Sequence, residues 1–459
     1  MSVFSLSNLK KTWYYLQKNG IRNAVWAVLE RIGQEQEVYT WQEPDEKTLS
    51  FQREHSASLR ISIVVPTYRT KKEHLEAMLN SVSNQSYPHW ELIVADAGGT
   101  AESVQAWAKK NGICLREAAD ASNLAEWKDQ SIVLCTLSEN KGISANTNAG
   151  IELAAGDAVG LLDHDDLLTA NALWEMADCL EKEKKRGKQK LVLFSDEDKC
   201  DGAASRFYEP NFKPDFDGEL LLTNNYICHF TVIETAFLKE LKLRSGFDGA
   251  QDYDLMLRAY AAGGQFVHVP KVLYHWRCHE ASTASNPQSK RYAYEAGQRA
   301  LEDYCLRKGW KATVSGLKHL GFYREDYEDS VFCQRPEIGI WAKPLPGGRD
   351  VFGIRHPKGF LVSGLYENDG SMRYAGLRKG YSGPMHRAAL QQSAPAADLR
   401  SMEVCSALKE RYAQTIAELK EACQGLSTAA QETKILQKSM EFCKEATAAG
   451  YGILWDPQA

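Results

Sequence analysis

From residue 61 onward, short apolar runs alternate along the chain with segments of helical periodicity. Apolar residues recur at helical spacing in 75–82 and 173–180, and the glycine-punctuated segment 140–157 predicts a turn that leads into a helix. Strands that alternate with helices predict a mostly parallel sheet covered on both faces. The predicted strands are 61–66, 89–98, 131–137, 159–163 and 191–194.

Acidic side chains follow three of these predicted strands. They are Asp96, the acids of 163–166 and the acids of 196–198. Because parallel strands end at one edge of a sheet, where α/β folds bind their ligands, we expect several of these acids to lie together. Clustered carboxylates repel one another and need a positive partner. The pattern therefore indicates a site for a divalent cation.

Length and composition limit the classes of protein that fit. The chain has 459 residues, enough for about three domains. A hydrophobic fraction of 44% and a charged fraction of 25% are typical of a globular protein. Lys and Arg total 55 against 60 Asp and Glu, so the net charge is -5 and we expect no nucleic-acid partner. No apolar run approaches the ~18 residues of a membrane span.

Cysteine usage and the first residues bear on location. The eleven cysteines include no CxxC pair, which predicts reduced, mostly buried thiols in a cytoplasmic protein. The first thirty residues mix aromatic and basic side chains and lack the pattern of a signal peptide. We expect them to pack against the rest of the protein, and a peripheral contact with a membrane surface stays open.

Four ordered blocks of the sequence carry a resemblance to a known family. The chain resembles the family-two inverting glycosyltransferases, especially bacterial enzymes that build O-antigen, rhamnan and other surface polysaccharides. The similarity covers about 61–318 and implies a GT-A fold, a Rossmann-like mixed and mostly parallel sheet with helices on both faces. The blocks are SIVVPTYRT, SNQSYPHWELIVADAGGT, NKGISANTNAGIELAAGDAVGLLDHDD and GAQDYDLMLRAYAAGGQFVHVPKVLYHWRCHEASTAS.

The resemblance implies a site for a nucleotide-sugar donor. Asp96 would accept a hydrogen bond from the base, although Ala97 stands where the family usually has a second acid. Arg277 would pair with the diphosphate. The residues assigned to this site are Pro66, Thr67, Tyr68, Asp96, Asn140, Lys141, Gly142, Asn148, Asp163, His164 and Arg277.

The resemblance also implies a Mn²⁺ or Mg²⁺ ion that bridges the two phosphates. Asp163 and Asp165 match the family's DxD motif. Family members often add a histidine from a later loop, and both His275 and His279 could serve. We prefer His279 because the RxHxxS spacing of 277–282 is similar to the family's loop.

The general base implied by the resemblance is Asp252. It would accept a proton from the acceptor hydroxyl, a contribution typically worth ~10²–10⁴-fold in rate. Gln251 stands where the family usually has a Glu, but the Asp that follows it is kept.

Ordinary structural roles compete with several of these assignments. Asp254 is expected to pair with Arg258 on one helix, and His268 is expected to be a core residue. Asp96 outside its context would more often be a turn or cap residue. Other DxD-like triplets, which lack the family context of 163–165, occur at 196–198, 215–217 and 252–254.

The chain divides into three predicted parts. Residues 1–58 form a helical N-terminal extension, 59–318 the GT-A catalytic domain, and 319–459 a C-terminal α/β domain. Residues 448–457 resemble 261–270 at an offset of 187, so we interpret the last part as a degenerate, partial second GT-A domain. The run 401–447 is helix-compatible.

Together these features predict a metal-dependent inverting glycosyltransferase. It would move a sugar from a nucleotide-diphosphate donor to a lipid-linked glycan acceptor in cell-surface polysaccharide synthesis. It would act in the cytoplasm, with peripheral attachment to the inner face of the plasma membrane and a homo-oligomer left open. The alternative is a non-catalytic, GT-A-derived glycan-binding or scaffold subunit. A NAD-type oxidoreductase is disfavoured because no GxGxxG follows the first strand.

Overall fold

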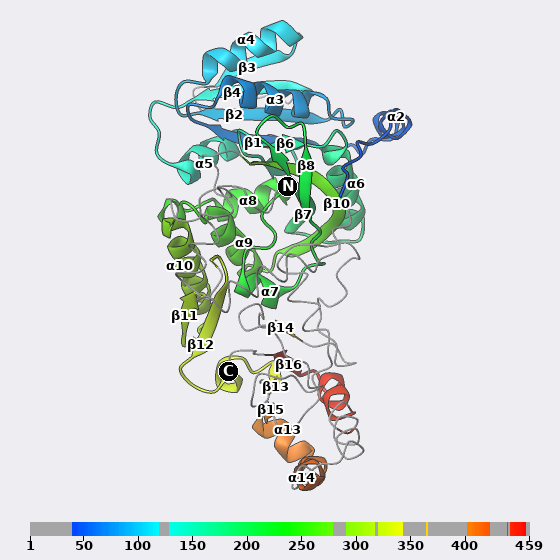
Figure 1. Ribbon diagram of the computed structural model, residues 1–459, viewed down its shortest axis with the longest axis vertical. Helices are drawn as coiled ribbons and strands as arrows, with labels where there is room; N and C mark the ends of the chain where they lie inside the picture. The colour runs from blue at the N-terminus through cyan, green and yellow to red at the C-terminus, as the bar shows by residue number, and fades with distance from the viewer. Residues whose placement is uncertain are drawn as a thin grey trace, which may run out of the picture.

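The computed structural model describes most of the chain, and Figure 1 shows its arrangement. The expectations for His279 and for the first thirty residues lie outside the described part. None of the described helices combines the length and apolar composition needed to cross a bilayer. The described residues are 39–118, 128–278, 291–316, 320–342, 364–365, 402–422, 438 and 441–455.

A mixed sheet of ten strands forms the centre of the described residues. Its order is β3-β4-β2-β1-β5-β9-β7-β10-β6, with β8 paired to β7. The strands from β3 to β5 are parallel, whereas β9 runs antiparallel to both β5 and β7. The predicted α/β class is confirmed, and the sheet reverses direction at β9. The strands are β1 (Ile61–Thr67), β2 (Trp90–Asp96), β3 (Cys114–Ala118), β4 (Ser131–Thr136), β5 (Ala158–Leu161), β6 (Leu167–Leu168), β7 (Leu191–Asp201), β8 (Phe207–Asn211), β9 (Thr231–Glu234) and β10 (Gln265–Cys278).

Helices cover both faces of the sheet (Figure 1). In β1, Ile63 and Val65 join the core beneath α3, α4 and α6, while Val64 joins the core on the face of α5, α8 and α9. This alternation follows from the two-residue period of a strand. The helices are α2 (Glu46–Glu54), α3 (Lys72–Ser83), α4 (Ala101–Asn111), α5 (Ile143–Leu153), α6 (Ala172–Lys185), α7 (Gly218–Thr223), α8 (Thr235–Leu241), α9 (Gln251–Ala261) and α10 (Arg291–Arg307).

The strand predicted at 191–194 is longer than expected. The acids of 196–198, which we expected beyond its end, lie inside β7. They remain in the sheet because each has a partner; Asp196 Oδ1, for example, lies 2.8 Å from His268 Nε2. His268 also stacks on Phe194 at 5.0 Å between centroids, so its predicted core role is confirmed.

The described end of the N-terminal extension packs against the large sheet. In α2, the buried side chain of Gln52 accepts a hydrogen bond from Ser86 at 2.7 Å. The Tyr39 hydroxyl donates to Asp198 Oδ2 at 2.6 Å, and Trp41 lies edge-on to His275. This segment therefore adds a layer next to β7 and β10.

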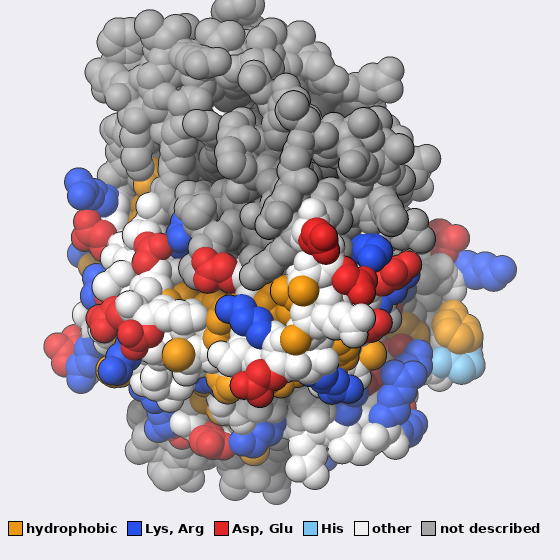
Figure 2. Space-filling view, turned by 90° about the horizontal axis from the view of Figure 1, so that it is seen from below, with side chains coloured by type: hydrophobic (Ala, Val, Ile, Leu, Met, Phe, Trp, Pro, Cys, Tyr) orange, Lys and Arg blue, Asp and Glu red, His pale blue; other side chains and the backbone are white. Residues whose placement is uncertain are grey.

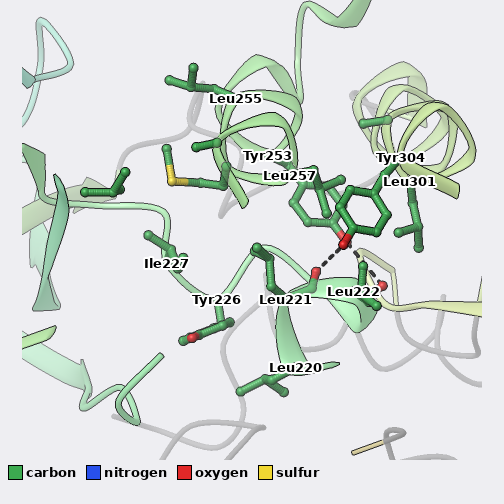
Figure 3. Close-up of a cluster of buried hydrophobic side chains, with 14 of the residues drawn as sticks. Leu220, Leu221, Leu222, Tyr226, Ile227, Tyr253, Leu255, Leu257, Leu301 and Tyr304 are labelled. Atoms are coloured by element: carbon green, nitrogen blue, oxygen red, sulfur yellow. Dashed lines mark hydrogen bonds between the residues drawn. The ribbon is translucent and has the colours of Figure 1, made fainter. Parts of the chain in front are cut away.

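The helix that carries Asp252 is fixed by the apolar core beneath it. Figure 3 shows this core between α7, α9 and α10, with Tyr253 projecting from α9. The Tyr253 hydroxyl donates to the backbone oxygen of Leu221 at 2.8 Å. Since large buried side chains lock the helix in place, Asp252 at its first turn has a defined position. The labelled residues are Leu220, Leu221, Leu222, Tyr226, Ile227, Tyr253, Leu255, Leu257, Leu301 and Tyr304.

The C-terminal part forms a second, four-stranded sheet of order β14-β16-β13-β15, at the end of the molecule away from α4 (Figure 1). The hairpin β11–β12 packs beside α10 and spans the predicted domain boundary at residue 318. The run 401–447 begins with a strand before its helices. The elements are β11 (Ala312–Gly316), β12 (Tyr323–Tyr327), α11 (Val331–Gln334), β13 (Ile338–Ala342), β14 (Gly364–Leu365), β15 (Met402–Val404), α13 (Ser406–Arg411), α14 (Ala413–Ala422) and β16 (Gly452–Trp455).

The sequence similarity at an offset of 187 has a structural counterpart. The N–H of Gln265 bonds to the carbonyl of Lys190 at 3.0 Å, and β10 then runs parallel to β7. At the matching position the N–H of Gly452 bonds to the carbonyl of Glu337 at 2.7 Å, and β16 runs parallel to β13. The helix before each of these two strands ends in a glycine turn. Because α10 also ends in such a turn but leads into an antiparallel hairpin, the feature that the two segments share is the turn followed by a parallel strand.

Figure 2 views the molecule from the end of the C-terminal part. Acidic and basic side chains are interspersed there, with apolar side chains between them. The described part of this face therefore offers no broad field of a single sign, such as the basic field that nucleic acid attracts.

The ion pair predicted for Asp254 is confirmed and suggests a test of stability. Arg258 Nε lies 2.9 Å from Asp254 Oδ2, and Arg244 Nε lies 3.1 Å from the same oxygen. We expect Asp254→Ala to destabilise the fold by about 3–5 kcal/mol, because it leaves the largely buried Arg258 without its counter-ion. Asp178→Ala, which removes an exposed partner of Lys182, should cost less than about 1 kcal/mol. Urea unfolding measures both, and similar losses would contradict the assignment.

Candidate functional site

Antiparallel pairing brings two distant segments of the chain to one point. Leu161, at the end of β5, pairs with Thr231, at the start of β9. The residues just after β5 therefore lie beside those just before β9, and His229 Nε2 is 3.9 Å from Asp163 Oδ2. Ligand atoms of Asp163, Asp166 and His229 all lie within 4.8 Å of one another.

The ring of His229 is fixed from its other side. Its Nδ1 lies 3.0 Å from Glu197 Oε2, and the ring stacks on Tyr274 at 4.7 Å between centroids. Because a carboxylate can only accept, Nδ1 carries the proton of this hydrogen bond. Histidines that bind metals are commonly oriented by such a bond, with the other nitrogen directed at the ion.

The electrostatics of the cluster favour added positive charge. Desolvation raises the pKa of Asp163 and of Asp166, and Asp165 raises both further, whereas His229 lowers them. Burial lowers the pKa of His229, but Cys228 and Glu197 more than offset this, so the pKa lies well above 6.5. His229 is therefore the basic group of the cluster, with its Nε2 on the side of Asp163.

The residues of this group suit a divalent cation. Carboxylate oxygens are the ligands that Mg²⁺ and Mn²⁺ prefer, and an imidazole nitrogen favours the later transition metals. Two carboxylates with one imidazole therefore form a donor set that a divalent cation could use. The DxD prediction paired Asp163 with Asp165, whereas the structure groups Asp163 with Asp166. Asp165 Oδ1 lies 4.0 Å from His164 Nδ1.

The predicted general base lies next to this cluster. Asp252 is only partly buried, and its Oδ2 accepts a hydrogen bond from Asn225 Nδ2 at 2.8 Å. Cys228 Sγ connects it to the cluster, at 3.6 Å from Asp252 Oδ2 and 3.4 Å from His229 Nε2. Asp252 also raises the pKa of Asp163. Gln251 accepts a bond from the backbone N–H of Gly249, a role that needs no charge.

The residues predicted at the nucleoside end lie at the end of β1. Tyr68 is exposed, with its ring against Gly98, as a surface for a base would be. Thr67 is buried and donates to Asp96 at 3.0 Å, while Pro66 is half-buried. Asp96 itself is buried, and both of its oxygens accept bonds from the start of α4 and from the loop before it, so the structure gives it a capping role.

The predicted donor loop at the start of α5 is tied to the segment before Asp252. Asp248 accepts bonds from the backbone and hydroxyl of Ser144. Asn140 orders the turn by accepting from the N–H of Gly142 at 3.1 Å. Asn148 uses both ends of its amide on the backbone of Leu243, a structural task. Lys141 is exposed beside Glu139.

The two predicted groups on β10 face different partners. Arg277 is buried, donates its backbone N–H to Asp166 at 2.7 Å and its Nε to the backbone oxygen of Asp165. Arg277 therefore stabilises the turn of 163–166 through Asp165 and Asp166. His275 is buried against Asp198, with Nδ1 at 2.5 Å from Oδ1, and does not belong to the group of Asp163.

Sequence reasoning did not select Asp166 or His229 as ligands. Asp166 was visible as the last acid of the DHDD run. His229 had no signal, because it lies between the recognisable blocks and reaches the site only through the antiparallel pairing of β9. Glu197 was seen as a strand-end acid, without its bond to His229.

Comparison with known proteins identifies the family of the domain that carries this site. Residues 62–241 match the sequence model of the family described as Glycosyl transferase family 2. The chain therefore carries a glycosyltransferase domain of family 2, and the resemblance drawn from the sequence is confirmed.

The chain is also similar to named relatives over part of its length. It is 34% identical over 256 residues to the O-antigen biosynthesis protein RfbC of Myxococcus xanthus, covering 56% of this chain and only 19% of RfbC. It is 27% identical over 232 residues to the amylovoran biosynthesis glycosyltransferase AmsB of Erwinia amylovora, covering 47% and 70%. The crystal structure of S. aureus TarS 1–349 in complex with UDP-GlcNAc matches with 20% identity and a TM-score of 0.41, over 54% of this chain and 67% of that one.

The tie between the donor loop and Asp248 can be tested at Gly142. This glycine has a φ of 94°, and an added Cβ would overlap Asp248 Oδ2. Gly112 has a φ of 69° with open space around it, so Gly112→Ala should cost about 1 kcal/mol from backbone strain alone. We expect Gly142→Ala to cost about 1–3 kcal/mol more, from the clash and from a backbone conformation (φ 94°, ψ 166°) that is nearly closed to other residues, whereas Gly112 lies in the left-handed helical region. Denaturant unfolding measures the difference, and equal losses would show that Asp248 does not press on this loop.

Proposed function

We propose that the chain transfers a sugar from a nucleotide-diphosphate donor to a glycan acceptor, with inversion and with the help of a divalent cation. The observation that carries the proposal is the cluster of Asp163, Asp166 and His229, with Asp252 connected to it through Cys228. A group that could hold a cation and a partly exposed carboxylate thus lie side by side, which supports the proposed chemistry.

Asp163, Asp166 and His229 would hold the cation, with Asp165 beside them. When bound, the cation would stabilise the negative charge that grows on the leaving diphosphate. Asp163 is the ligand most open to the donor, since Asp166 is buried and already accepts bonds from Tyr274 and Arg277. His275 and His279 stay second choices to His229, the former because Asp198 already holds it.

Asp252 would accept the proton of the acceptor hydroxyl. Asn225 and Cys228 both bind its Oδ2, so within the described residues Oδ1 is left to face the acceptor. Attack from the side of Asp252, opposite the leaving diphosphate, is the geometry that inverts the anomeric centre. The exposed Tyr68 would stack on the nucleoside base at the other end of the donor.

The names of the relatives suggest the class of product. RfbC is named for O-antigen biosynthesis and AmsB for amylovoran biosynthesis, so we propose a surface polysaccharide as product and a lipid-linked glycan as acceptor. The ten cysteines that the structure describes are free thiols, which suits the proposed cytoplasmic location.

Donor binding can be screened without knowing the sugar. We expect UDP or dTDP to raise the melting temperature of the chain more strongly with Mn²⁺ than without it, because a ligand that binds only the folded state stabilises it. EDTA should remove the added stabilisation, and Asp163→Ala should abolish the effect of Mn²⁺. If neither nucleotide changes the melting temperature, the proposed donor site is wrong.

Replacement of the base separates an enzyme from a non-catalytic relative. We expect Asp252→Asn to lower kcat by about 10²–10⁴-fold while leaving the Mn²⁺-dependent stabilisation by nucleotide intact. Asp215→Asn, which changes an exposed carboxylate bonded to His268, serves as the control and should keep full activity. Turnover of the donor is followed by release of the nucleoside diphosphate. A chain that binds nucleotide and never turns over would favour the glycan-binding or scaffold alternative.

A further inference from the structure

A buried ammonium group anchors the segment that carries His229. Lys213 is 1% exposed, and its Nζ donates to the backbone oxygen of Ile227 at 2.5 Å and to that of His229. These two carbonyls flank Cys228, so one ammonium group fixes the backbone on both sides of the residue that connects His229 to Asp252. The same Nζ lies 3.4 Å from Glu197 Oε2.

The carboxylate of Glu197 accepts hydrogen bonds from three side chains. Besides Lys213, it accepts from Asn211 Nδ2 at 3.1 Å and from His229 Nδ1 at 3.0 Å. Burial raises its pKa, but Lys213 and His229 outweigh burial and lower the pKa to about 2. Glu197 is therefore a carboxylate at any ordinary pH. It lies within β7, which pairs with β8, β9 and β10.

We infer that Glu197 and Lys213 are a pair of positioning residues for the cation site, holding His229 with its Nε2 directed at Asp163. The inference rests on the proposed cation site and adds residues that do not touch the cation or the donor. Glu197 fixes the imidazole ring of His229 through Nδ1. Lys213 fixes the backbone of His229 and pairs with the carboxylate of Glu197.

A purely structural role explains this arrangement less well. A buried ion pair is often no more stable than apolar residues of the same volume, because desolvation of the two charges offsets their attraction. Here the pair is directed at one histidine, which stands 3.9 Å from a carboxylate of the cluster. The gain is therefore expected in the orientation of His229 rather than in the stability of the fold.

The test measures cation affinity directly. Free Mn²⁺ is counted by electron paramagnetic resonance during titration of the chain, with UDP or dTDP present in separate series. We expect Glu197→Gln to weaken Mn²⁺ binding by about 10–100-fold, the usual effect of losing the group that orients a metal-binding histidine. His229→Ala should weaken it at least as much.

A matched control removes a buried carboxylate elsewhere. Glu175 is 8% exposed, pairs with Lys271 at 2.6 Å and lies on α6. Glu175→Gln should leave the Mn²⁺ affinity unchanged. Since Glu197→Gln leaves Lys213 buried without a counter-ion, the double variant Glu197→Gln/Lys213→Met keeps the test decisive if the single variant does not fold. The double variant should regain stability without regaining Mn²⁺ affinity.

The outcomes separate this inference from the proposed function. If the wild-type chain binds no Mn²⁺ with either nucleotide, the cation site itself is wrong and the positioning role is overturned with it. If the wild type binds Mn²⁺ and Glu197→Gln binds it equally well, only the positioning role is overturned. The positioning role also fails if Glu175→Gln weakens binding as much as Glu197→Gln does, because the effect would then come from any buried charge.

Discussion

Crowding of carboxylates at the end of β5 is the constraint on which the site depends. Asp163, Asp165 and Asp166 lie within four residues just after β5, and Asp252 approaches from the first turn of α9. Burial raises the pKa of Asp163 and of Asp166, and the neighbouring carboxylates raise both further because like charges disfavour one another. His229 partly offsets this repulsion, since it lowers the pKa of both acids, and a divalent cation would offset it more strongly. The acids and His229 thus form a place that suits positive charge, as the proposed transfer from a nucleotide-diphosphate donor requires.

The reversal of the sheet at β9 is what makes this possible. A wholly parallel sheet would bring only strand ends of one kind to its edge, and the residues before β9 would lie at the opposite edge. Because β9 runs antiparallel to β5, the segment before it returns to the end of β5. Lys213 then holds this segment through its backbone oxygens. Asp252 comes from the first turn of α9, which is anchored by Tyr253 in the core below it. The proposed cation site and the proposed base therefore belong to one packed framework rather than to separate loops.

This topology also explains how far the sequence could lead. Five strands, the helices α3 and α6 and the Asp254–Arg258 pair follow from local periodicity, and the structure agrees with them. The predicted strands correspond to β1, β2, β4, β5 and the start of β7, whereas β3, β6, β8, β9 and β10 were not predicted. The acids after β5 and the position of Asp252 follow from ordered motifs. His229 depends on a long-range antiparallel pairing that no local pattern encodes. The extent of β7 was missed for a related reason, since buried acids stay in a strand only when partners from other strands neutralise them.

The buried charges also bear on the choice between an enzyme and a scaffold of the same fold. A scaffold gains nothing from acids held close together, and apolar or neutral replacements would relieve their repulsion. The C-terminal unit repeats the turn and parallel strand of α9 and β10, and at the offset of 187 Ser439 stands where Asp252 would be. In the sequence, the segment that resembles α9 and β10 thus lacks the acid, whereas the first unit keeps its acids despite their cost. Electrostatic repulsion that lowers stability and is nevertheless retained is expected at a functional site.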